Sequence, residues 1–190
     1  MAQLTAGNIG NTYNNEYVLS VDRAKKRETL LLAVPFLDRV GKEMADRGYD
    51  AKEAVPRLMT AAHDLVFDVI EYCEPAKEGG MPTIVMKASV DADVARIYFV
   101  WNQSMGVDLM AIAKKEKEDL DALVGEGALS AELDGRADYG ATRKAQGRLD
   151  GMSMGLALVA GLADRFDEFY DPVRKLKTVT LAVRRLKDGA

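Results

Sequence analysis

Few side chains in this chain of 190 residues are suited to nucleophilic catalysis or zinc binding, because the sequence contains one histidine and one cysteine. A zinc site built mainly from histidines needs more ligands than His63, and an internal disulfide needs a partner for Cys73. His63 lies on the flank of a helical pattern, where a neighbouring side chain can satisfy its ring. Cys73 falls on the apolar stripe of that pattern, where a cysteine behaves as a small hydrophobic residue. We therefore expect neither residue to be catalytic.

Carboxylates offer a second route to chemistry, because Mg²⁺ prefers oxygen ligands. Glu71 and Glu74 form a Glu-x-x-Glu tetrapeptide, and Glu116 and Asp119 form a later Glu-x-x-Asp tetrapeptide. The pair of tetrapeptides resembles the pattern of the all-helical nucleotide pyrophosphohydrolases. That resemblance implies, as an alternative function, a Mg²⁺-dependent nucleotide hydrolase with these four carboxylates as its catalytic set.

Helical geometry favours a different interpretation of the acids in the segment around Glu71. At 100° per residue, Asp64, Asp68 and Glu71 lie nearly opposite the apolar stripe that contains Leu65 and Val69. Acids opposite a buried stripe face water, whereas a metal site needs them convergent and enclosed. We therefore predict solvated acidic faces with no metal and no cofactor, and we favour a non-enzymatic protein over the hydrolase, which stays an open alternative.

Three glycines four residues apart lie in a stretch that otherwise favours helix: Gly147, Gly151 and Gly155. Each glycine inside a helix costs about 1 kcal/mol relative to alanine, so the set needs a compensating gain. Residues four apart share a helix face, and glycines there let another backbone approach closely. The spacing resembles the close-packing motif of membrane helices and predicts a helix-packing interface on a central helix of about 30 residues.

Charge is unevenly distributed, because the chain has a net charge of −4 while its last 20 residues are basic. The basic residues of this end are Arg174, Lys175, Lys177, Arg184, Arg185 and Lys187. A solvated basic helix is one interpretation, and attraction between this end and an acidic body, within a chain or between copies, is another. Nucleic-acid binding, as a small regulator, is a further alternative because phosphate contacts need clustered Lys and Arg.

Apolar residues recur at helical spacing along most of the chain. The pattern predicts helices over about 20–48 with an interruption at Pro35, about 50–74, 89–112, 141–170 and 171–190. Residues 178–183 also alternate as a strand would, but we prefer a helix there, and 83–86 are expected to form a short strand at most. An irregular arm over 1–19 and a hinge or loop over 75–82 complete the prediction. We expect an all-α bundle of five to seven helices, with 20–190 as a single domain.

The expected role is that of a non-enzymatic assembly or adaptor protein. It is based on the apolar residues of the N-terminal arm, the opposite charges of body and tail, and the lack of a catalytic motif. These features suit a homo-oligomer or a repeated subunit of a larger particle, such as a ring, a neck or a virion. The longest apolar run, 152–163, is too short to cross a bilayer. No signal peptide is visible, so we expect a cytoplasmic protein.

Overall fold

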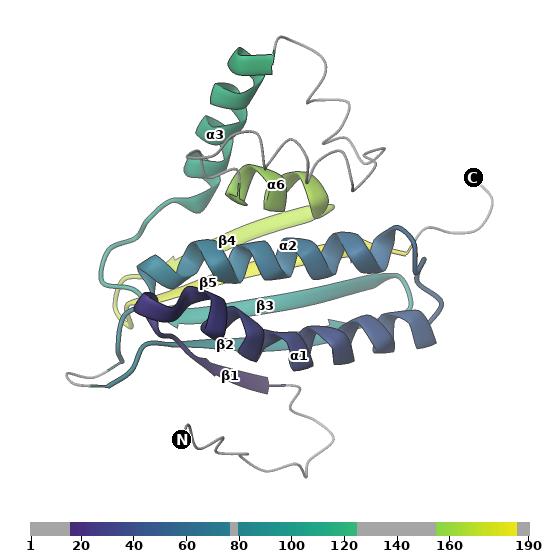
Figure 1. Cartoon of the computed structure of the whole chain (residues 1–190), viewed down its shortest axis with the longest axis horizontal. Coiled ribbons are helices and arrows are strands. Elements are labelled where there is room, and N and C mark those ends of the chain that lie inside the picture. Colours follow the sequence, from purple (N-terminus) through teal and green to yellow (C-terminus); the bar gives the residue numbers. More distant parts are fainter. Residues whose placement is uncertain (1–15, 77–79, 125–154, 186–190) are drawn as a thin grey trace.

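A five-stranded antiparallel sheet with the strand order β1-β2-β3-β5-β4 forms the base of the protein (Figure 1). The computed structural model describes residues 16–76, 80–124 and 155–185. The strands are β1 (Glu16–Ser20), β2 (Thr83–Val90), β3 (Val94–Asn102), β4 (Arg165–Asp171) and β5 (Leu176–Arg184). The α-helices are α1 (Lys26–Asp46), α2 (Ala54–Val69), α3 (Leu109–Val124) and α6 (Gly155–Leu162).

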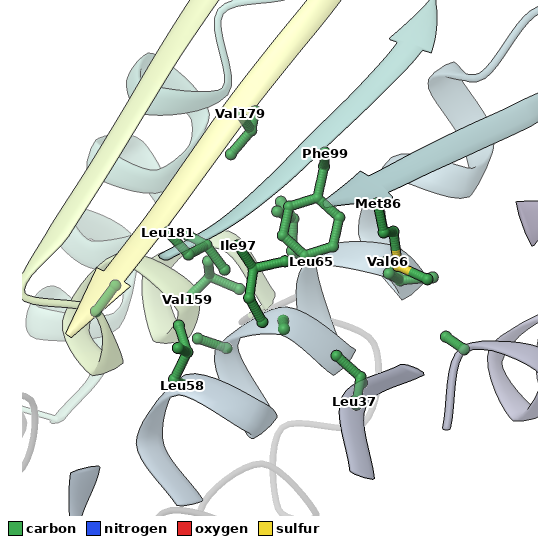
Figure 2. Packing of buried hydrophobic residues seen from close by; sticks show 14 of the residues in the cluster. Leu37, Leu58, Leu65, Val66, Met86, Ile97, Phe99, Val159, Val179 and Leu181 are labelled. Carbon is green, nitrogen blue, oxygen red and sulfur yellow. The ribbon is translucent and has the colours of Figure 1, made fainter. Parts of the chain in front are cut away.

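Helices α1 and α2 cover one face of the sheet, and α6 packs against α2 and α3 (Figure 1). The apolar stripe of α2, which includes Leu58 and Leu65, faces the sheet because its residues recur at helical spacing. Every second residue of β3, including Ile97 and Phe99, is buried beneath these helices. Figure 2 shows the resulting core, in which side chains of the sheet meet those of α1, α2 and α6. The core is therefore a single layer between the sheet and its helices.

The all-α helical-bundle prediction is wrong, and the segment 89–112 shows why. Its apolar residues fit a helical spacing, but Val94–Asn102 is rich in β-branched and aromatic residues and forms β3. Strand β3 pairs with β2 on one side and β5 on the other, which satisfies its backbone along its whole length. A strand with apolar residues on both faces also has apolar residues at helical spacing. Periodicity alone therefore assigned Val94–Asn102 to a helix.

The C-terminal helix and the long glycine-bearing helix are corrected in the same way. Leu176–Arg184 forms β5, following a turn in which Lys175 has a positive φ of 54°. The predicted helix 141–170 is not one helix, because α6 ends at Leu162 and β4 begins at Arg165. Its earlier part, with Gly147 and Gly151, lies outside the described residues.

Two helices lie where the sequence predicted them. Helix α1 ends before Gly48, whose φ of 80° is the left-handed conformation that glycine adopts readily at a helix C-terminus. It runs through Pro35 as one helix, however, and not as two. Helix α2 and a following 3₁₀ turn, Ile70–Tyr72, occupy most of the second predicted helix. The predicted irregular arm over 1–19 is wrong for its last residues, because Glu16–Ser20 pairs with β2 as an edge strand, and residues 1–15 lie outside the described residues.

Candidate functional site

The face of the sheet opposite α1 and α2, which we call the open face, carries a row of apolar side chains. The side chains of Met86, Phe99 and Val179 point toward the helices (Figure 2), so their sequence neighbours point the other way. The strand registers align five of these outward residues in one row across the sheet: Val18, Val85, Val100, Thr178 and Phe169. Four of the five are apolar and the fifth is a threonine; we call this set the apolar row. No helix of the described residues lies over it (Figure 1).

The ends of the apolar row are its most exposed part. Val18 on β1 is 56% exposed and Phe169 on β4 is 65% exposed, whereas the three residues between them are half-buried by their neighbours. Next to the row, Tyr98 and Thr180 are paired across β3 and β5 and are also half-buried. The middle of the open face therefore has no charged side chain among these positions.

Charged groups lie around this uncharged middle and are already paired with one another. Glu16 and Lys87 form an ion pair of 3.1 Å at the β1 side of the face. Arg165 and Asp167 form another on β4. Arg96 bonds to Asp91 in the β2–β3 turn at 2.7 Å. The arrangement of an apolar centre within a polar rim is typical of protein–protein interfaces.

The two edges of the sheet differ from its open face, because their residues discourage strand addition. Strand β1 is only five residues long and begins with Glu16. Strand β4 carries Arg165, Asp167 and the inward-pointing Glu168. Short edge strands and charged or inward-pointing acids are the usual protection against edge-to-edge pairing. The open face is thus a better candidate for contact with another protein than either edge.

The four carboxylates of the hydrolase alternative lie in separate surroundings. Glu71 forms an ion pair of 2.5 Å with Lys26. Glu74 accepts hydrogen bonds from the backbone N–H and the hydroxyl of Ser104, at 2.9 and 2.6 Å. Asp119 is exposed on α3. Within the described ranges, no three His, Cys, Asp or Glu side chains converge as a metal-binding group.

Glu116, the fourth of these acids, belongs to α3, and its side chain contacts the N-terminus of α6. Its carboxylate accepts a hydrogen bond of 3.0 Å from the backbone N–H of Ala157. Burial raises the pKa of Glu116, while the backbone N–H groups of Ala157 and Leu156 oppose the rise. Anions are stabilised at helix N-termini, so the position explains this acid as a cap on α6. Asp68 of α2 approaches the same helix end, at Gly155.

A buried ion pair that the sequence analysis missed anchors the N-terminus of α3. Lys177 donates to the carbonyl of Val107 at 2.8 Å and pairs with Glu168 at 2.5 Å. Glu168 also accepts hydrogen bonds from the backbone N–H groups of Leu109 and Met110, at 3.0 and 3.1 Å. The sequence signal for this site was limited to Glu168 and Lys177 themselves. Glu168 lies 58 and 59 residues from the backbone groups that it holds, and Lys177 lies 70 residues from Val107.

Asp108 completes this helix start as an N-cap. Its carboxylate accepts a hydrogen bond of 2.7 Å from the backbone N–H of Ala111. That bond, followed by a hydrogen bond with Glu168, lowers the pKa of Asp108. These contacts all serve to hold α3 on the sheet, so we interpret the cluster as structural.

His63 and Cys73 occupy the unremarkable positions that the sequence suggested. The His63 ring lies 3.6 Å from the Asp64 carboxylate on a partly exposed flank of α2. Cys73 is fully buried, and its thiol donates to the carbonyl of Val69 at 3.2 Å. Burial raises the pKa of Cys73 to about 12, against a smaller opposite effect of Arg23. A thiol of this kind is not a nucleophile at neutral pH.

The C-terminal basic residues do not form one patch. Arg174 and Lys175 lie in the turn before β5, and Arg184 and Arg185 lie at its far end. Nine strand residues separate the two ends by about 30 Å. Lys177 is buried in its ion pair, and Lys187 lies outside the described residues.

Of the three predicted packing glycines, the structure describes Gly155, the first residue of α6. A side chain there would collide with the Asp68 carboxylate of α2. Gly155 thus lies against another helix, but the atoms that approach it belong to a side chain and not to a backbone.

A shallow depression of about 440 Å³ lies next to the end of β1 and the start of β2. Its lining residues include Val21, Arg23 and Met81. Its charged groups already have partners: Asp22 accepts from the backbone N–H of Ala24, and Arg23 donates to the carbonyl of Cys73. The depression therefore offers no free catalytic set among its lining residues.

Comparison with known proteins gives no family assignment. No protein-family model matches the chain, and no curated protein has a significantly similar sequence. In the parts of the chain that the structure describes, no helix combines the length and the apolar character needed to cross a membrane.

Proposed function

We propose that this protein is a non-catalytic assembly or adaptor subunit that binds another protein surface through the open face of its sheet. The observation that carries the proposal is the apolar row. It runs across all five strands, ends in the exposed side chains of Val18 and Phe169, and has no helix of the described residues over it.

The composition of the open face favours contact with another protein rather than exposure to solvent. An antiparallel sheet with one solvated face usually alternates apolar and polar residues along each strand. Strand β3 departs from this pattern in part, since Val94, Tyr98 and Val100 lie on its outer side together with Arg96 and Asn102. Strand β5 adds Leu176 and two uncharged polar residues, Thr178 and Thr180. Large apolar surfaces with a polar rim on a folded protein mark interaction sites.

A charge placed on the open face tests this function. We expect the wild-type chain, in a lysate of cells that make it, to migrate in an assembly larger than its own 20.8 kDa. Phe169→Glu should return the chain to the size of a monomer, because a carboxylate in the contact must be desolvated. Native size in a sizing column, followed by detection of the chain, is the measurement.

Leu31→Glu is the matched control, since Leu31 is 67% exposed but lies on α1, on the other side of the sheet. It adds the same charge and should leave the assembly unchanged. A wild-type chain that already migrates as a monomer in the lysate would refute the proposal. So would a Phe169→Glu variant that migrates with the wild type.

A further inference from the structure

We infer that the surface covering the open face is the open face of a second copy of this chain, so that two sheets stack as the layers of a sandwich. The inference rests on the proposed function and names its partner. Stacked sheets pack about 10 Å apart with their strands nearly aligned, and each copy would then contribute one sheet with helices on its outer side.

The area of the open face is that of a small, stable dimer interface. Five strands at a spacing of about 4.8 Å give a width of about 24 Å. The three inner strands have eight or nine residues, which gives a length of about 25 to 30 Å. Because β1 and β4 have only five and seven residues, two such faces would bury roughly 1,200 Å² together, at the lower end of specific interfaces.

The charge of the open face suits contact with itself. Four basic and three acidic residues point outward, a net charge of +1: Lys87, Arg96, Arg165, Arg184, Glu16, Asp167 and Asp171. Three of the basic residues already have acidic partners within the chain. A nearly neutral face neither repels its copy nor attracts a strongly charged partner such as nucleic acid.

The shape of the open face also suits a second sheet. The middle of the apolar row has side chains of moderate size, Val85, Val100 and Thr178, and the larger Tyr98 lies beside them on β3. No bulky residue of the row interrupts them, because Phe169 lies on the edge strand β4. Two-fold contacts are self-complementary, and full overlap of the two sheets requires the axis to pass over the central strand β3. With that axis running along β3 between the two sheets, Val100 lies opposite its own copy.

Solution mass of the purified full chain is the first measurement. We expect light scattering at micromolar concentration to give twice the 20.8 kDa of one chain. Val100→Lys should halve this mass, because two ammonium groups would face each other, while a lone lysine in the monomer can extend to water. Leu31→Lys on the outer side of α1 is the control and should retain the doubled mass.

Cross-linking locates the contact independently of any loss of folding. A cysteine introduced at Val100 should be joined to its copy by a short bis-maleimide, whereas a Leu31→Cys variant should not. The native thiol of Cys73 is fully buried and provides a low background. Facing backbones about 10 Å apart are too distant for a direct disulfide, so the reagent is required.

The outcomes separate this inference from the proposed function. A purified chain of 20.8 kDa that still joins a larger assembly in the lysate would overturn the second copy and leave the adaptor role intact. In that case another protein, or residues 1–15, would cover the face. A dimer that neither Val100→Lys nor Phe169→Glu affects, and in which Val100→Cys is not cross-linked, would use a different surface and would also overturn the inference. A chain that is monomeric in both settings would refute both proposals.

Discussion

Lys177 is the one buried charged residue in the parts of the chain that the structure describes, and its surroundings account for it. Its ammonium lies between the Glu168 carboxylate and the carbonyl of Val107. Glu168 in turn bonds to the first backbone N–H groups of α3. One ion pair thus joins two strands to the start of a helix, which is the reason that a costly buried charge persists here.

Lys177→Met is therefore expected to destabilise the fold by about 3 to 5 kcal/mol, because it leaves the Glu168 charge buried without a counter-ion. Adding Glu168→Gln to this variant should restore part of the loss. Lys114→Met, which removes an exposed ion pair with Glu118, should cost less than about 1 kcal/mol. Denaturant unfolding monitored by circular dichroism measures all three, and a loss as small for Lys177→Met as for the control would contradict the assignment.

Glu116 gives a prediction for pH. Because its pKa is raised in the folded protein, the folded state holds this proton more tightly than the unfolded chain. The stability it contributes is therefore fully present below the ordinary glutamate pKa of 4.5 and is lost as the pH rises through the folded value. Glu116→Gln carries no charge at any pH, so the variant should gain stability relative to the wild type between about pH 4 and pH 8.

Melting temperatures of both proteins across that range test the sign. Glu118→Gln, on the exposed side of the same helix, controls for the loss of one negative charge. A difference between wild type and Glu116→Gln that stays constant, or that favours the wild type as the pH rises, would show that burial of Glu116 is not the dominant effect.

At the scale of elements, α6 illustrates how a short helix is held. It has eight residues, fewer than an isolated helix needs for stability, so its packing against α2 and α3 must maintain it. The Glu116 carboxylate binds its N-terminus, and Asp68 occupies the space beside Gly155 where a side chain would otherwise lie. The glycine therefore serves the contact between α6 and α2.

Two glycine substitutions with opposite expected signs test this account. Gly155→Ala should destabilise the protein by about 1 to 3 kcal/mol, because its methyl group would displace the Asp68 carboxylate. Gly41→Ala, inside the C-terminal third of α1, should stabilise it by about 0.5 to 1 kcal/mol, because a methyl group there meets Val55 and Met59 at ordinary contact distances. Thermal unfolding compares the two variants, and an equal or higher melting temperature for Gly155→Ala than for the wild type would refute the close contact.

At the scale of the whole molecule, the described residues form an asymmetric two-layer structure. One layer consists of the sheet and the other of α1, α2 and α6, with the core between them (Figures 1 and 2). A sheet covered on one face by described helices, with an apolar row across the other face, resembles half of a three- or four-layer assembly. This asymmetry is what relates the fold to the proposed role, because a second sheet would complete the packing of the open face.

The candidate surface could not be predicted from the sequence, and the apolar row shows the reason. Its members come from positions 18, 85, 100, 169 and 178 and become neighbours only through four antiparallel pairings. The sequence analysis placed Phe169 in the predicted helix 141–170. Its exposure follows from the pairing of β4 with β5 at the edge of the sheet. The capping roles of Glu116 and Glu168 have the same origin, since each cap joins segments more than 40 residues apart.

The sequence by itself determined the local features whose causes lie within a few residues. Among these are the helices that became α1 and α2, the left-handed glycine after α1, and the burial of Cys73 on an apolar stripe. Val94–Asn102 and Leu176–Arg184 carry both helix-like and strand-like patterns, and tertiary structure decided that they are strands, and with them the sheet and its open face. A strand is stabilised by hydrogen bonds to partners distant in the chain, whereas a helix satisfies its backbone within each turn, so only the folded chain can distinguish two such apolar segments.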